Sequence, residues 1–262
     1  MNYGICCGPD RFDCLAENGY SYAEPPMAAL RGLDDERLFE IKAKADRCGI
    51  AVEGFNCFFG GDAKLNSDPE DSLLAYAGRN FEVANILGAS YCVIGSGVSR
   101  RIPDENLRDS LLEKYVRVFD SIASLGAKFG VRTIFEPLCR DETNFCNTLT
   151  EGIEFVRRVG NENLGCLVDF YHFYLSGEDL SEFDILRPGE LSHVHVARPD
   201  PDRAYLKEEN RATFVKWAEA LRRVGYDGNL SIECTFGKDF EAEIRASRPM
   251  LALFDSERFV GL

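Results

Sequence analysis

Eight short runs of apolar and β-branched residues, separated by stretches with helical spacing, constrain the fold of this chain more than any other feature. The runs cover residues 3–7, 18–24, 50–55, 91–94, 131–135, 164–168, 191–196 and 230–234. Helical patterns fill most of the intervals, at 33–48, 71–87, 105–129, 150–159, 180–186 and 210–224. A last helical segment, 240–254, is expected to be interrupted at Pro249. This alternation indicates parallel strands joined by helical crossovers.

The number of these units predicts the architecture. Eight strand–helix units in 262 residues fit an α/β protein with a closed (β/α)8 barrel, a fold of roughly 250 residues. The alternative is an open doubly wound sheet, but no G-x-G-x-x-G follows the first strand, and Gly95-Ser96-Gly97 is too short to indicate a phosphate loop. No linker, repeat or low-complexity run divides the chain, so residues 1–262 are expected to form a single domain.

The acidic balance of the chain narrows the range of partners. Its 30 basic and 44 acidic side chains give a net charge of −14, so no basic field attracts nucleic acid or an acidic membrane surface. No apolar run reaches membrane-spanning length, and no signal peptide is visible. The ten cysteines form no C-x-x-C pair and are expected as free thiols in the cytoplasm. The oligomeric state stays open, with a homo-oligomer among the expectations.

Acidic side chains and one imidazole stand at the ends of four successive predicted strands. The run 131–135 ends in Glu136, the next run ends in Asp169, and the last two present His195 and Glu233. In a barrel of this type the carboxyl ends of the strands form one rim, which carries the site. Three carboxylates repel one another there unless a cation joins them. Oxygen ligands with one imidazole favour Mn²⁺ first, with Mg²⁺ or Co²⁺ as alternatives and Zn²⁺ less suited.

Each of these residues also has a simpler structural explanation. Glu233 can pair with an arginine of the outer loops, and Asp169 can cap the helix that follows it. His193 lies on the same strand face as His195, so one of the two is expected to be a core imidazole bonded to the backbone; we assign that role to His193. Four candidates in order on adjacent strands nevertheless favour a functional site.

Three motifs resemble those of a known family of enzymes. The segments EPLCRDETNFCNT from Glu136, VDFYH from Val168 and HVHVARPDPDR from His193, closed by SIE at Glu233, are similar to the sugar isomerases and epimerases with xylose isomerase-like barrels. The similarity is greatest to the D-tagatose 3-epimerase branch, and GYSYAE at residues 19–24 adds a weaker match.

The resemblance implies roles for individual residues. One divalent metal would be held by the four strand-end residues, and Glu136 and Glu233 would also move the proton. Glu142 would hold a substrate hydroxyl, and His172, the histidine of the D-x-x-H pattern, would contact substrate. The family's arginine after the H-x-H strand matches Arg203 best.

The chain also departs from the pattern of that family. Cys139 replaces a usual asparagine, and the loop after His195 has two extra residues, so Arg198 competes with Arg203 for the substrate. Arg203 can alternatively pair with Asp200 or Asp202. These departures fall on substrate contacts, so they leave the identity of the sugar more open than the metal.

The residue types predict proton transfer next to a carbonyl group. A metal that chelates a carbonyl and an adjacent hydroxyl acidifies the carbon between them, and two carboxylates can remove and return the proton through a cis-enediolate. The expected activity is therefore epimerisation or isomerisation of a ketose or a related polyhydroxy carbonyl compound. The alternatives on the same scaffold are an inosose dehydratase-type lyase, a hydroxypyruvate isomerase-type aldose–ketose isomerase and a non-catalytic sugar-binding barrel. An apurinic endonuclease is disfavoured, because the chain has only three histidines and an acidic charge.

Overall fold

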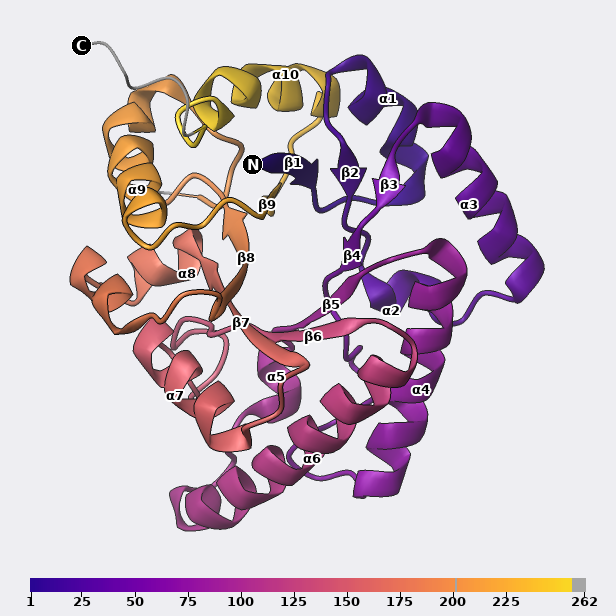
Figure 1. The fold of residues 1–262 in the computed structure, drawn as a ribbon, viewed down its shortest axis with the longest axis vertical. Coiled ribbons are helices and arrows are strands. Elements are labelled where there is room, and N and C mark those ends of the chain that lie inside the picture. The colour runs from indigo at the N-terminus through magenta and orange to yellow at the C-terminus, as the bar shows by residue number, and fades with distance from the viewer. Residues whose placement is uncertain (201, 256–262) are drawn as a thin grey trace.

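A closed ring of parallel strands forms the centre of the molecule (Figure 1). The computed structural model describes residues 1–200 and 202–255. The strands in this part of the chain are β1 (Asn2–Ile5), β2 (Tyr22–Ala23), β3 (Ala51–Val52), β4 (Gly54–Phe55), β5 (Tyr91–Ile94), β6 (Arg132–Phe135), β7 (Leu164–Asp169), β8 (Leu191–Val196) and β9 (Asn229–Ile232). Their order in the sheet is β3-β2-β1-β9-β8-β7-β6-β5-β4, and all pairs are parallel.

The two ends of this order are halves of one strand, interrupted at Glu53. The Glu53 N–H donates to the carbonyl oxygen of Ala23 at 3.2 Å, and its own carbonyl accepts from Ser90 N at 2.8 Å. The hydrogen bonds therefore continue around the ring, and the eight predicted strands form the predicted (β/α)8 barrel.

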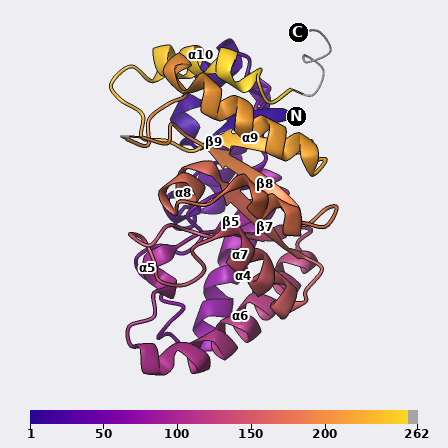
Figure 2. The same cartoon turned by 90° about the vertical axis from the view of Figure 1, so that its left-hand side faces the viewer.

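Helices surround the ring of strands on its outside (Figures 1 and 2). They are α1 (Phe12–Glu17), α2 (Met27–Leu30), α3 (Asp35–Cys48), α4 (Glu70–Leu87), α5 (Gly97–Arg100), α6 (Arg108–Lys128), α7 (Leu149–Val159), α8 (Phe170–Leu175), α9 (Arg211–Arg223) and α10 (Phe240–Leu251). Short 3-10 turns cover Pro9–Arg11, Glu105–Leu107, Leu180–Ile185 and Glu208–Asn210. None of the helices in the described part of the chain is long and apolar enough to cross a membrane.

The longer helices begin and end where their sequences predict. The Asp34 carboxylate caps α3 by accepting from Arg37 N at 2.9 Å, and Gly49 ends the helix with φ of 67°. In α6 the predicted stripe buries Leu111, Tyr115 and Ile122 against the barrel. A local cap marks the start of α3, and an apolar face marks both helices, which is why the sequence alone is informative here.

Two helical predictions are wrong. The sequence patterns predicted no helix between β7 and residue 180, but α8 follows at once and stacks Phe170 on Trp217, with ring centres 4.6 Å apart. Six residues are too few to show a helical period. Helix α10 is also not interrupted at Pro249, because this proline lies close to the end of the helix and the next two residues, Met250 and Leu251, are buried.

Candidate active site

The residues that end or follow the strands meet at one mouth of the barrel. A parallel register places the strand ends side by side: Ile94 is opposite Phe135, Asp169 opposite His195, and Val196 opposite Ile232. Eight residues stand at one of the last two positions of a strand or directly after a strand. In chain order they are Cys6, Glu24, Asn56, Gly95, Glu136, Asp169, His195 and Glu233. The mouth therefore collects acidic groups and one histidine from strands that are far apart in the sequence.

The four predicted metal ligands lie together in this ring. Glu136, Asp169, His195 and Glu233 each offer a donor atom, and these atoms all lie within 4.8 Å of one another. Nδ1 of His195 is 3.1 Å from Oε2 of Glu233 and 3.4 Å from Oε1 of Glu136. Glu233 also accepts a hydrogen bond from the Asn56 amide at 3.1 Å. The arrangement is a compact set of three carboxylates around one imidazole nitrogen.

Two atoms of this cluster lack a hydrogen-bond partner in the described part of the chain and could instead bind a cation. Oε1 of Glu136 and Nδ1 of His195 are buried and have no hydrogen-bond partner among the described residues. Buried polar atoms are normally paired, because leaving one unpaired costs about 1–3 kcal/mol. Both atoms are ligands for a divalent ion when His195 is neutral, and the set of oxygen donors with one imidazole suits Mn²⁺ or Mg²⁺. The residues present therefore fit a divalent metal.

The two glutamates of the cluster have opposite electrostatic environments. Burial, followed by the charge of Glu233, raises the pKa of Glu136 above its ordinary value. Burial also acts to raise the pKa of Glu233, but the charges of Arg203 and His195 outweigh it and hold that pKa well below the ordinary range. Carboxyl groups whose pKa values are pushed apart can serve as acid and base at one pH.

Arg203, and not Arg198, reaches the cluster. Nη2 of Arg203 donates to the carboxylates of Asp169 and Glu233, and its guanidinium lies 4.9 Å from the ring centre of Tyr171. Arg198 instead pairs with Glu209 at 2.6 Å and with Asp202 at 3.5 Å. The alternative that Arg203 pairs with an aspartate of its own loop is therefore wrong, and that description applies to Arg198.

Both simpler explanations for the acidic residues hold alongside their place in the cluster. Oδ1 of Asp169 caps α8 by accepting from Tyr171 N at 2.8 Å, while Oδ2 faces Arg203 and the cluster. Glu233 does pair with an arginine, but that arginine is Arg203 of the same mouth. One oxygen of Asp169 thus fixes the side chain, and the other faces the cluster, where it accepts from Arg203.

His172 lies beside the cluster rather than within it. Its Nδ1 accepts from Cys139 N at 3.4 Å, and its Nε2 lies 3.6 Å from Asp169 and 3.7 Å from Glu142. Burial acts to lower the pKa of His172, but the negative charge of Asp169 outweighs it and raises the pKa to about 9. The imidazole ring faces the same space as the half-exposed Glu142, at the edge of the cluster.

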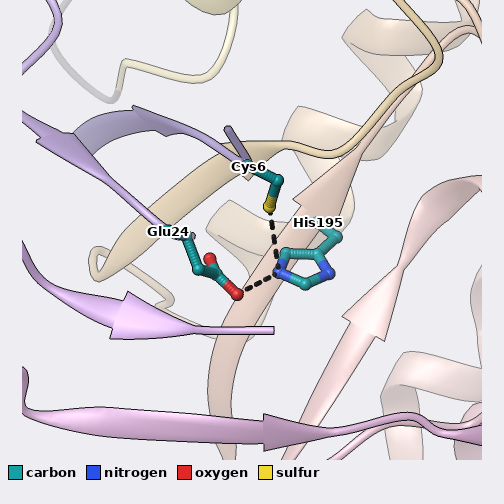
Figure 3. A group of neighbouring side chains, drawn as sticks. All are labelled: Cys6, Glu24 and His195. Carbon is teal, nitrogen blue, oxygen red and sulfur yellow. Dashed lines mark hydrogen bonds and ion pairs between the residues drawn. The ribbon is translucent and has the colours of Figure 1, made fainter. Parts of the chain in front are cut away.

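Glu24 was noted in the sequence only as a strand end, yet it is central to the site. Its Oε1 lies 3.0 Å from Nε2 of His195, and Sγ of Cys6 approaches the same nitrogen at 3.9 Å (Figure 3). His193 is buried as expected. The predicted hydrogen bond from His193 to the backbone is wrong, because Nε2 bonds instead to Oε2 of Glu24 at 3.0 Å. The rule that singled out Glu136, a carboxylate at a strand end, would also have found Glu24.

Two further residues shape the position of Glu136. A Cβ on Gly95 would lie 2.3 Å from Oε2 of Glu136, so only glycine leaves room for this carboxylate. Arg100 is fully buried, and its Nη2 donates to the backbone carbonyl of Glu136 at 2.7 Å. Burial lowers the pKa of Arg100 to about 10, which still leaves the side chain charged at neutral pH. No sequence motif pointed to Gly95 or Arg100 as neighbours of Glu136.

The mouth of the barrel opens into a cavity of about 290 Å³ next to Glu233. Arg203 and Asn56 line it together with Cys6, Cys57 and Thr235. A larger cavity of about 390 Å³, beside α6 and α7, includes none of the four clustered residues. Of these two cavities, the smaller one touches the cluster, through Glu233.

The fold and the site together define a barrel enzyme with a carboxylate-rich strand-end site that fits a divalent metal. Residues 12–252 match the family model of the xylose isomerase-like TIM barrel, and the chain belongs to this family.

Relatives of known activity are isomerases and epimerases. The chain is 27% identical over 233 residues to D-psicose 3-epimerase of Ruminiclostridium cellulolyticum, covering 84% of this chain and 75% of that protein. It is 23% identical over 230 residues to inosose isomerase of Halalkalibacterium halodurans, covering 83% and 79%. A crystal structure of D-psicose 3-epimerase in the presence of D-fructose has the same fold, with a TM-score of 0.79 at 19% identity, over 96% of this chain and 97% of that one. The chain is thus an enzyme of the isomerase and epimerase class.

Proposed function

We propose that this enzyme epimerises or isomerises a ketose or a related polyhydroxy carbonyl compound, with a divalent metal and with Glu136 and Glu233 as the proton-transfer pair. The observation that carries the proposal is the pair of glutamates that both approach His195 Nδ1, Glu136 at 3.4 Å and Glu233 at 3.1 Å. The relatives named as 3-epimerases act on ketoses, which supports this class of substrate.

The metal would be held by Glu136, Asp169, His195 and Glu233, with Mn²⁺ expected first and Mg²⁺ or Co²⁺ as alternatives. When bound, it supplies a Lewis acid that acidifies the carbon beside the substrate carbonyl. Glu233, whose pKa is held low by Arg203 and His195 against the effect of burial, is ionised and able to accept that proton. Glu136, whose pKa is raised by burial and by Glu233, is suited to return one.

Three neighbouring side chains would hold the sugar. Arg203 presents a fixed positive charge to the cavity, where it can stabilise an oxygen that becomes negative during proton transfer. Glu142 and His172 lie 3.7 Å apart at the edge of the cluster, and both are able to bond to hydroxyl or carbonyl oxygens of the substrate. A guanidinium has no lone pair for a metal, so Arg203 belongs to the substrate side.

Isotope exchange tests this function directly. The protein is loaded with Mn²⁺ and incubated in D₂O with a panel of ketoses, and NMR follows deuterium at each carbon next to the carbonyl. We expect exchange at one position with formation of the C3 epimer. Exchange without inversion but with aldose formation indicates an aldose–ketose isomerase instead, and loss of water indicates a dehydratase-type lyase. No exchange with any member of the panel contradicts the proposal and favours a sugar-binding barrel.

An inosose is a specific second candidate substrate. The relative in Halalkalibacterium halodurans is named inosose isomerase and aligns with 83% of this chain. An inosose is a cyclic polyhydroxy ketone, so the same two glutamates could move its proton. Adding an inosose to the D₂O panel separates the two candidates by relative rates of exchange.

A further inference from the structure

Glu24 is a buried carboxylate that no step of the proposed proton transfer uses. It follows β2, is 0% exposed, and divides its two oxygens between different partners. Oε1 faces Nε2 of His195 at 3.0 Å (Figure 3). Oε2 accepts from Ser231 Oγ at 2.7 Å and from the Tyr91 hydroxyl at 3.1 Å, and lies 3.0 Å from Nε2 of His193.

The chemistry of a carboxylate decides which atoms carry the protons in this network. Oε2 of Glu24 accepts hydrogen bonds from both the Ser231 and the Tyr91 hydroxyl groups, as an ionised carboxylate does. An ionised carboxylate only accepts hydrogen bonds. Nε2 of His195 must therefore be the donor. When the ring binds a metal it is neutral, and its lone pair is then on Nδ1, which faces Glu136 and Glu233.

We propose that Glu24 is the positioning residue that fixes His195 as its Nε2–H tautomer and thereby presents Nδ1 to the metal. The inference rests on the metal site of the proposed function. A ligating histidine commonly donates its second ring N–H to a carboxylate, which fixes the tautomer and the ring orientation and makes the ligating nitrogen more basic. Here the carboxylate comes from β2 and the histidine from β8, on opposite sides of β1 and β9 in the sheet order.

The network around Glu24 holds its carboxylate in one orientation. Tyr91 reaches Glu24 from β5 because its ring occupies the space above Gly54, where a Cβ would lie 2.0 Å from the ring. Ser231 donates to Glu24 and is itself bonded to the Tyr22 hydroxyl at 2.9 Å. Each of these contacts is buried, so Oε1 is directed at His195 without competition from solvent.

Cys6 is the competing partner for the same nitrogen, and the geometry favours Glu24. The Cys6 thiol is 3.9 Å from Nε2 of His195, against 3.0 Å for Glu24. A thiol is a weak acceptor, whereas a carboxylate accepts a strong, charge-assisted hydrogen bond. Removing the thiol should therefore leave the tautomer of His195 unchanged.

The first experiment measures Mg²⁺ binding by calorimetry, without any sugar. We expect Glu24→Gln to weaken binding roughly 10- to 100-fold, the range found when a hydrogen-bond partner of a ligating histidine is replaced. An amide has one acceptor oxygen for the four groups that face Glu24, and its NH₂ donates, so it cannot hold His195 as the carboxylate does. Glu82→Gln, on the exposed face of α4, is the matched control and should keep the wild-type affinity. Cys6→Ala removes only the weaker partner of His195 and should keep it as well. Equal affinity in wild type and Glu24→Gln overturns the inference.

The second experiment uses the wild-type protein, so it does not depend on the folding of a variant. Nitrogen NMR of histidine-labelled protein loaded with Mg²⁺ shows which ring nitrogen of His195 carries the proton. We expect a proton on Nε2 and coordination through Nδ1; the reverse assignment overturns the inference. If the wild type binds neither Mg²⁺ nor Mn²⁺, the metal site itself is refuted, and with it both proposals. Binding without isotope exchange refutes only the proposed activity, because neither readout requires turnover.

Discussion

Arg203 is bonded to Glu233 through both the backbone and the side chain of that residue. Its Nε donates to the carbonyl oxygen of Glu233 at 3.1 Å, and its Nη2 donates to the carboxylate. Burial acts to lower the pKa of Arg203, but Glu233 and Asp169 outweigh it and raise that pKa far above its ordinary value. The loop after β8 thus brings a permanent positive charge to the end of β9, where one of the two proposed proton-transfer groups stands.

Replacing Arg203 should separate substrate stabilisation from metal binding. We expect Arg203→Ala to lower kcat/KM by about 100-fold, because a group that stabilises developing charge commonly contributes this much. Metal occupancy should remain complete, since all four ligands are intact. Arg198→Ala is the matched control and should change kcat/KM little, because Arg198 pairs with Glu209 and Asp202 outside the cluster. The assignment fails if elemental analysis finds that Arg203→Ala has lost its metal, or if the control loses the activity instead.

The glutamine variants of the two glutamates test their role in proton transfer. Glu136→Gln and Glu233→Gln should each reduce turnover by at least about 100-fold even at saturating Mn²⁺, since an amide cannot accept the proton. Each change also removes a negative charge from the cluster, so metal affinity should fall as well. Glu82→Gln, on the exposed face of α4, is the control. Recovery of near wild-type rates at high metal would restrict the glutamates to metal binding.

Gly95→Ala tests how closely the site is packed. The added Cβ would meet Oε2 of Glu136 at 2.3 Å and must displace this carboxylate. A misplacement of about 1 Å can cost roughly 100-fold in rate, so we expect a loss of that order with little change in Tm. Gly61→Ala adds the same methyl group where nothing lies within 4 Å, and should behave as wild type. Equal activity of the two variants would show that Glu136 does not need the position seen here.

The protonation of Glu178 should make the stability of the folded state fall as pH rises. Burial raises its pKa from 4.5 to about 8, although its carboxylate accepts from Leu149 N at 2.7 Å. Between these two values the folded state holds a proton that the unfolded chain has released, so the stability contributed by the protonated group is lost as pH increases through this window. Glu178→Gln keeps the acceptor oxygen and cannot ionise. Its Tm should therefore exceed that of the wild type increasingly from pH 5 to pH 8, and parallel curves of Tm against pH would contradict the assignment.

The sequence was most informative where one local rule determines the structure. The apolar runs, the cap at Asp34 and the terminal Gly49 each act within a few residues, so strands and helices could be predicted from them. The number of alternating strands and helices then favoured a barrel, and a barrel places all strand ends at one rim. The sequence therefore predicted the cluster of Glu136, Asp169, His195 and Glu233 before any coordinates were known.

The tertiary structure alone decided which residues support that cluster. The contact between Glu24 and His195 joins positions 171 residues apart, and it depends on the register of the closed sheet. The choice between Arg203 and Arg198 depends on the path of one loop, and the need for glycine at position 95 depends on the side chain of the neighbouring strand. Such contacts follow from the three-dimensional packing of segments distant in sequence, and hydrophobic periodicity carries no information about them.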